Sequence, residues 1–139
     1  VQIEALIENR RLLKDKYLRS ILKKDKSIQE DVNLDFLQKT TDIVYSGLKN
    51  PDFSPTDIAN KLNLSTSQLN RKLNAVSGYA ASSYILKLRI DLAKKKLAYD
   101  DKPIGQIAEE CGFFDVAYFS RIFKKHTNVT PSQYRRLPH

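Results

Sequence analysis

An internal repeat of about fifty residues limits the folds open to this chain more than any other feature of its sequence. Ile58-Ala59 recurs as Ile107-Ala108, and after one additional residue in the second copy the two copies keep a constant register. The further matched pairs are Ser65 with Asp115, Leu69 with Phe119, Arg71 with Arg121, Leu73 with Phe123, Gly78 with Asn128, and Tyr84 with Tyr134. Because predicted caps, turn residues and core positions recur together, the repeat predicts two copies of one helix–tight turn–helix unit.

The first copy carries clear signals for the start of each of its helices. Ser54 is a favourable N-cap, and it is followed by Pro55 at the first helical position and by Asp57 in the first turn. The second helix is predicted to begin after Ser65, because Gln68 three residues later completes a capping-box pattern. We therefore expect a first helix-turn-helix over about 54–78.

The turn between the two helices contains a residue that adopts positive φ easily in each copy. This residue is Asn63 in the first copy and Gly112 in the second. Gly78 and its repeat partner Asn128 are suited to the left-handed position that ends a helix. The second helix-turn-helix is predicted over about 103–127.

The segment between the two copies is predicted to be one unbroken helix over about 82–99, since it contains no Gly or Pro. Its apolar residues recur at helical spacing and comprise Tyr84, Ile85, Leu88, Leu92, Ala93 and Leu97. A helix of this length spans roughly 27 Å at ~1.5 Å per residue. With the offset of each copy from its end, the second helices are expected about 34 Å apart, which is one turn of B-DNA.

The predicted fold class is all-α, with two helix-turn-helix subdomains joined by a long linker helix and with extra N-terminal helices. A helix is expected from Val1 to about Ile28, a polar loop or linker from Lys23 to Asn33, and a second helix from Leu34 to Lys49 before Asn50-Pro51. We divide the chain into an N-terminal helix and linker over 1–33 and a domain over 34–139 that ends in a helix at about 131–137. Ile3, Leu6, Leu13 and Tyr17 lie on a seam with alternating spacings of three and four that Arg10 interrupts, which favours either ordinary packing on a neighbouring helix or a homodimer.

Charge and cysteine content indicate the class of partner and the compartment. The net charge is +8, and residues 51–139 carry 14 Lys or Arg against 8 Asp or Glu, so the excess lies in the part that contains the repeat. A polyanion is the simplest partner for this excess. One cysteine excludes an internal disulfide and a cysteine-cluster zinc site, and no apolar run reaches the ~20 residues of a membrane span. We expect a cytoplasmic location, no membrane contact by this chain and no signal peptide.

The second helix of each copy presents side chains that suit the DNA major groove, where each base pair shows a distinct pattern of donors and acceptors. These side chains are Ser67, Asn70, Arg71 and Asn74 in the first copy, and Val116, Ala117, Ser120 and Arg121, followed by Lys124 and Lys125, in the second. Asn can bond adenine with two hydrogen bonds, Arg can do the same with guanine, and small apolar groups can meet thymine methyls. The alternative interpretation is a merely solvated helix face.

The second copy, IAEECGFFDVAYFSRIFKKH over 107–126 and TPSQYR over 130–135, closely resembles the C-terminal signature of the AraC/XylS family of bacterial transcription regulators. The linker is similar as well, at Tyr84-Ile85, Arg89, Ala93 and Leu97, whereas the first copy is looser because Ala81 stands where the second has Pro131. The resemblance covers about residues 52–136. It implies sequence-specific binding of double-stranded DNA to regulate transcription, and RNA polymerase as a partner.

The resemblance also implies which residues contact DNA. Base contacts fall on Ser67, Asn70, Arg71, Val116, Ala117, Ser120 and Arg121, and phosphate contacts on Lys72, Asn74, Lys124, Ser132 and Arg135, with the amides at the helix starts near Ser54 and Ser65. Family members have larger polar groups at the positions of Ser67, Val116 and Ala117. Some specificity is therefore expected to come from DNA shape.

Three upstream segments, residues 8–17, 35–39 and 50–54, resemble the output end of hybrid two-component systems, in which such a domain follows a phosphoacceptor receiver domain. The implied parent protein is a response regulator with a sensor and kinase upstream, and it can be membrane-anchored. A sugar-binding cupin arm is not recognisable in the sequence.

Several residues favour structural rather than chemical roles. The predicted core residues are Cys111, Phe113, Phe119 and Phe123. Solvated helix faces are predicted for two charged segments, Glu109-Glu110 and Lys94-Lys95-Lys96. His126 and His139 lack partners at ligand spacing, so no metal or other cofactor is expected. The sequence offers no nucleophile–base pair and no phosphate-cradling loop, so an enzyme is not predicted. A protein-interaction module is the competing function.

Overall fold

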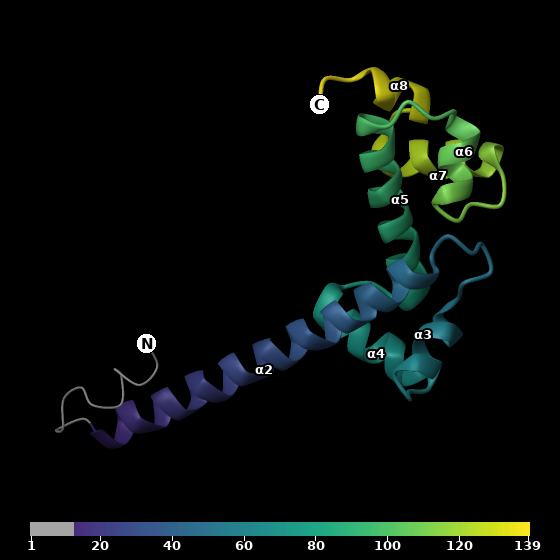
Figure 1. Ribbon diagram of the computed structural model, residues 1–139. Coiled ribbons are helices and arrows are strands. Elements are labelled where there is room, and N and C mark those ends of the chain that lie inside the picture. The colour runs from purple at the N-terminus through teal and green to yellow at the C-terminus, as the bar shows by residue number, and fades with distance from the viewer. Residues whose placement is uncertain (1–12) are drawn as a thin grey trace. The chain divides into compact units, whose positions relative to one another are not determined.

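The computed structural model describes the backbone of residues 13–139 and the side chains of residues 27–139. Within this part the chain is helical and contains no strand, which confirms the predicted all-α class. The helices are α2 (Leu13–Gly47), α3 (Pro55–Lys61), α4 (Thr66–Ser77), α5 (Ala81–Tyr99), α6 (Ile104–Glu110), α7 (Val116–Thr127) and α8 (Pro131–Arg136), as Figure 1 shows. None of these helices is both long enough and apolar enough to cross a membrane.

The chain divides into two compact units, residues 1–39 and residues 40–139. Helix α2 contributes to both units. In the first unit, α2 exposes the apolar side chains of Ile28, Val32 and Leu34, and it carries an ion pair in which Lys39 Nζ lies 3.1 Å from Asp35 Oδ2. The predicted packing of Ile3 and Leu6 lies outside the described residues.

The loop predicted over residues 23–33 is wrong, because α2 continues through it and through the predicted start of a second helix at Leu34. This stretch is polar, but it contains no Gly or Pro, and Lys, Gln and Glu are good helix formers. The amide of Gln29 donates to Asn33 Oδ1 at 3.0 Å, which is a typical contact between residues four apart on a helix. Polarity alone therefore did not mark the end of a helix here.

Helix α5 is the central element of the second unit. Its 19 residues form one unbroken helix, as predicted, with a length of roughly 28 Å. Helices α3 and α4 pack against it near its start, and α6 and α8 pack against it near its end, while α7 packs on α6 and α8 (Figure 1). Both helix-turn-helix copies are thus attached to the same helix.

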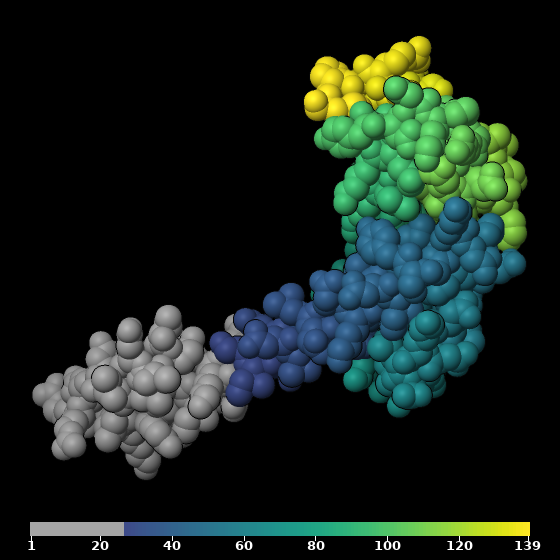
Figure 2. Space-filling model, in the orientation of Figure 1, coloured from purple at the N-terminus to yellow at the C-terminus, as the bar shows by residue number. Residues whose placement is uncertain are grey.

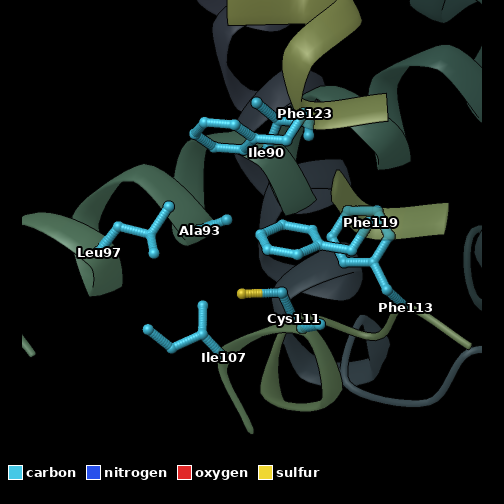
Figure 3. Close-up of a cluster of buried hydrophobic side chains, with 9 residues drawn as sticks. Ile90, Ala93, Leu97, Ile107, Cys111, Phe113, Phe119 and Phe123 are labelled. Carbon is cyan, nitrogen blue, oxygen red and sulfur yellow. The ribbon is translucent and has the colours of Figure 1, made fainter. Parts of the chain in front are cut away.

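The core of the second copy forms between the last turns of α5 and the helices α6 and α7. Figure 3 shows that its side chains converge from these elements, with the sulfur of Cys111 directed into the cluster. The rings of Phe113 and Phe119 lie 4.8 Å apart, and those of Phe119 and Phe123 lie 5.6 Å apart. Cys111 is fully buried, and burial raises the pKa of its thiol to about 12. The predicted core roles of all four residues are confirmed.

The turn and cap residues adopt the backbone conformations predicted for them. Asn63 and Gly112 have φ of +56° and +85°, and Gly78 and Asn128 end α4 and α7 at φ of +78° and +69°. In each pair one copy uses Gly and the other uses Asn, the two residue types with the lowest cost in this region. The repeat therefore extends to the backbone.

The end of α2 belongs to the core of the second unit. Val44 and Leu48 are buried, and the hydroxyl of Thr41 is hydrogen-bonded to the hydroxyl of Tyr84 in α5 at 2.7 Å. Arg89 of α5 donates from Nε to the carbonyl of Leu48 at 3.3 Å and from Nη2 to the carbonyl of Asn50 at 3.0 Å. Partial burial lowers the pKa of Arg89, although the guanidinium stays charged.

A cluster of charges ties α6 to the end of α5 and corrects two predictions of solvated faces. Glu110 accepts from Lys96 Nζ at 2.9 Å, from Lys102 Nζ at 3.1 Å and from Gln106 Nε2 at 3.1 Å. These hydrogen bonds lower the pKa of Glu110 to about 2. The side chains of Glu110 and Lys96 are only 17% and 27% exposed, because the face of α6 that carries Glu110 turns toward α5. Spacing within one helix could not reveal that partner.

Candidate nucleic-acid interface

Helices α4 and α7 each have a buried apolar face and an outward face that carries the predicted base-contacting residues. Leu69 and Leu73 anchor α4, and their repeat partners Phe119 and Phe123 anchor α7. Both helices are 12 residues long. The predicted base-contacting set is exposed at Ser67, Asn70, Arg71, Val116, Ala117 and Arg121 and half-buried at Ser120.

The starts of these two helices are held by side-chain caps. The backbone N–H of Gln68 donates to Ser65 Oγ at 3.1 Å, and the N–H of Ser65 donates to Gln68 Oε1 at 2.9 Å. In α7 the N–H of Tyr118 donates to Asp115 Oδ1 at 2.6 Å. A capped first turn keeps the side chains that would enter a groove in a defined direction.

The same caps occupy the backbone N–H groups of Ser54 and Ser65 themselves. The N–H of Ser54 already donates to Asp57 Oδ2 at 2.8 Å, and the N–H of Ser65 is used by its own capping box. A capping box satisfies the amide of the N-cap residue, so the phosphate contacts predicted at the helix starts near Ser54 and Ser65 rest on the other amides of each first turn and stay a prediction. The other phosphate candidates, Lys72, Asn74, Lys124 and Ser132, are exposed.

Arg135, the remaining candidate for a phosphate contact, is held by backbone carbonyls. Its Nη2 atom donates to the carbonyls of Asp100 and Lys102 at 3.1 and 2.6 Å, and its Nε atom is buried. Arg135 thus braces the loop before the second copy, as Arg89 braces the loop before the first. The sequence repeat did not reveal that the two arginines have similar roles, because they do not occupy equivalent positions. Arg135 is the repeat equivalent of Ile85, and Arg89 lies four residues, about one helical turn, after Ile85.

Asn70 differs from the other base-contacting candidates because its side chain already holds a backbone group. Its Oδ1 atom accepts from the N–H of Ala81, the first residue of α5, at 2.8 Å. The predicted two-bond contact with adenine needs that oxygen as an acceptor for the base, so the prediction does not fit this geometry. The repeat-equivalent residues are Ser120 and Pro131, and proline has no N–H to be held.

The start of α7 is apolar where the start of α4 is polar. Phe114, Val116 and Tyr118 are 72%, 46% and 41% exposed. A hollow of about 360 Å³ is lined by Phe114 and Tyr118 together with Pro51, Arg89 and others, and Figure 2 shows the segment after α2 adjoining the second copy at the surface. Sequence reasoning identified Val116 in this group and missed the two aromatic residues, which look like core positions until the fold exposes them.

Comparison with known proteins identifies the family. A family model described as a helix-turn-helix domain matches residues 58–137. Histidine kinase P4 of Formosa agariphila is 29% identical over 97% of this chain and 10% of its own length. The HTH-type transcriptional activator RhaS of Mannheimia succiniciproducens is 35% identical over 57% of this chain and 30% of its own length. The chain therefore spans a small part of these relatives.

Among solved structures, the C-terminal domain of the two-component response regulator yesN from Fusobacterium nucleatum is similar in fold and sequence. It has a TM-score of 0.68 and 30% identity, and the match covers 73% of this chain and 99% of that one. The family model covers more than half of the chain, and this relative is covered almost completely. The chain belongs to the helix-turn-helix family of AraC-type DNA-binding domains that transcription regulators carry.

Proposed function

We propose that this chain is the sequence-specific double-stranded DNA-binding output domain of a bacterial signalling regulator. The observation that carries the proposal is the pair of capped 12-residue helices, α4 and α7, each held by its buried face in a helix-turn-helix copy that packs on one unbroken helix, α5. A helix with an exposed polar face fits the major groove, and two such helices about one turn of DNA apart fit successive grooves on one side of the duplex.

The two helices are proposed to contact bases with different chemistry. Arg71 and Arg121 would each donate two hydrogen bonds to a guanine, and Ser67 and Ser120 would add single hydrogen bonds. Val116 and Ala117 would meet thymine methyl groups at the start of α7. Lys72, Asn74, Lys124 and Ser132 remain the proposed phosphate contacts. They would set the position of the domain on the duplex without carrying sequence information.

Two relatives support a proposal for the place of the domain in a longer protein. The matched kinase aligns over nearly the whole chain, and the solved relative is named as part of a two-component response regulator. We propose that the chain follows a receiver domain in a hybrid two-component protein and works in the cytoplasm without enzymatic activity of its own. Contact with RNA polymerase would fit the similarity to a named activator. The exposed Ile28 and Val32 of α2 would support a homodimer.

Selection of bound sequences from a random DNA pool tests the proposal directly. Two short motifs with centres about ten base pairs apart are expected, because the two helices would enter neighbouring major grooves. Affinity should fall steeply with salt, since phosphate neutralisation releases counterions. Enrichment of a single motif, or of none, would contradict the two-groove arrangement. If the chain instead binds a partner protein, and this binding is independent of DNA and persists at high salt, the protein-interaction module is favoured.

A further inference from the structure

The junction between α4 and α5 contains a buried backbone donor that only one side chain satisfies. Ala81 is the first residue of α5 and is fully buried. Its N-cap is Ala80, which has no side-chain acceptor for the free N–H groups at the start of the helix. The Oδ1 atom of Asn70, which projects from α4, accepts the Ala81 N–H at 2.8 Å. An unbonded donor in this place would destabilise the fold.

The second copy reaches the same junction without such a bond. Pro131, the equivalent of Ala81, is buried and stands at the first position of α8, where proline is favoured and brings no N–H. Thr130 caps that helix with its own capping box, in which Gln133 N–H donates to Thr130 Oγ1 at 3.2 Å. Ser120 in α7 therefore has no equivalent of the Ala81 donor to satisfy. A side-chain hydrogen bond thus joins α4 to the start of α5, whereas α7 and α8 need no such bond.

We infer that Asn70 is a positioning residue that holds α4 against the start of α5. We also infer that its side chain presents only hydrogen-bond donors to DNA. The oxygen and nitrogen of the amide lie on opposite sides of Cγ, and a backbone N–H can be bonded only by the oxygen. The Nδ2 group is therefore the part of the amide turned away from Ala81. Such a group suits an acceptor, such as guanine O6 or N7, adenine N7 or thymine O4, and it cannot accept from adenine N6.

This inference rests on the proposed function for its DNA part, whereas its positioning part does not depend on DNA. Urea denaturation of the free protein tests the positioning part. Asn70→Ala should raise the equilibrium constant for unfolding about fivefold, the effect of losing one typical hydrogen bond. Asn70→Asp keeps an acceptor for the Ala81 N–H and should stay close to wild type. Ser120→Ala, the matched change in the second copy, should also stay close to wild type.

The substitution Ala81→Pro completes a double-mutant cycle. Ala80 has φ −69° and ψ 159°, a conformation that the residue before a proline adopts readily, so the backbone accommodates the change. In the Ala81→Pro background, Asn70→Ala should no longer destabilise the protein and can even stabilise it, because the donor is gone and the proline ring occupies the space next to Asn70 Oδ1. Equal destabilisation by Asn70→Ala and Asn70→Asp, or by neither, overturns the positioning role. If Ala81→Pro does not fold, the comparison of the stabilities of Asn70→Ala and Asn70→Asp decides whether Asn70 has the positioning role.

Selection from a random DNA pool tests the donor-only part. Asn70→Ala and Asn70→Asp should both lose a preference for guanine or thymine at one position of the first motif, although only the former is destabilised. Loss of a preference for adenine over guanine at that position would overturn the inference that Asn70 presents only donors, because that preference needs an acceptor for adenine N6. If Asn70→Ala is less stable than Asn70→Asp but the wild-type protein binds no DNA, the proposed function is overturned and the positioning role of Asn70 stays supported.

Discussion

Gly112, in the turn of the second helix-turn-helix copy, lies directly against the carbonyl oxygen of Leu48 at the end of α2. A Cβ atom at position 112 would stand 1.8 Å from this oxygen and 2.9 Å from Nε of Arg89. The same carbonyl accepts a hydrogen bond from Arg89. One peptide group after α2 is thus shared between the linker helix and the second copy, so residues upstream of the matched family segment help to build the DNA-binding unit.

Substitution of Gly112 by alanine should destabilise the domain by roughly 2–4 kcal/mol. The added Cβ meets a backbone oxygen that cannot move freely, and φ of +85° is unfavourable for alanine. Gly105→Ala is the matched control, since nothing lies within 4 Å of its Cβ position, and α6 should tolerate or gain from the change. Urea denaturation of both variants measures the difference. Equal stability of the two would contradict the close approach of Leu48.

Arg89→Met should lower the free energy of unfolding by about 1–3 kcal/mol. The change removes two hydrogen bonds from a charged donor to the carbonyls of Leu48 and Asn50 while keeping an apolar stem. Lys87→Met removes the ion pair between Lys87 Nζ and Asp91 Oδ2, which is 2.9 Å long and partly exposed, and should cost less than about 0.5 kcal/mol. Thermal unfolding followed by circular dichroism compares them, and a larger effect at Lys87 would refute the bracing role of Arg89.

Glu110→Gln should destabilise the domain near neutral pH and lose this effect in acid. The folded-state pKa of Glu110 is lowered from 4.5 to about 2, so the ionised carboxylate stabilises the fold above pH 4.5. That contribution falls as the pH drops from 4.5 toward 2, where the group becomes protonated in the folded state as well. Melting temperatures of wild type and variant should therefore converge across this window.

The neighbouring Glu109 supplies the control for the charge cluster. Its side chain is exposed, and Glu109→Gln removes the same charge one residue away. This variant should melt close to wild type at neutral pH. A Glu109→Gln effect as large as that of Glu110→Gln would mean that net charge, and not the contacts with Lys96 and Lys102, sets the stability.

The Cys111 thiol should resist modification while the domain is folded. It is fully buried, and its pKa is raised to about 12, so almost no thiolate is present at pH 8. A thiol reagent such as dithionitrobenzoate should react at the rate of unfolding in buffer and rapidly in concentrated urea. Rapid reaction of the native protein would show that the core around α6 opens locally.

Arg71→Ala and Arg121→Ala should each weaken specific DNA binding by roughly 1–3 kcal/mol without changing the melting temperature. Both guanidinium groups are exposed on the outward faces of α4 and α7. Lys95→Ala, at an exposed position on α5, is the control and should change affinity much less. Gel-shift titration on the selected site provides the measurement. Unchanged affinity in both arginine variants would remove these residues from the proposed base contacts.

The sequence by itself determined the features that depend on neighbours within a few residues. The capping of α4 by Ser65, the positive φ of Asn63 and Gly112, and the apolar faces of α4 and α7 are local, and all appear in the structure as predicted. The unbroken α5 belongs with them, because helix continuity depends mainly on the absence of Gly and Pro. The continuity of α2 followed the same rule, and its polar composition obscured it.

Only the tertiary structure decided which polar groups remain available to DNA. Asn70 is 11 residues from Ala81, and Arg135 is 33 residues from Lys102 and 35 from Asp100, yet each is bonded to those backbone groups. The bond between Arg89 and Leu48 spans 41 residues. Contacts at such separations arise from the packing of helices on α5. The sequence could not predict them, because residue type and helical spacing are the same whether a side chain faces solvent or bonds a backbone group. The sequence therefore predicted which helices carry the proposed DNA contacts, and the fold decided which of their side chains are held by backbone groups of the same chain.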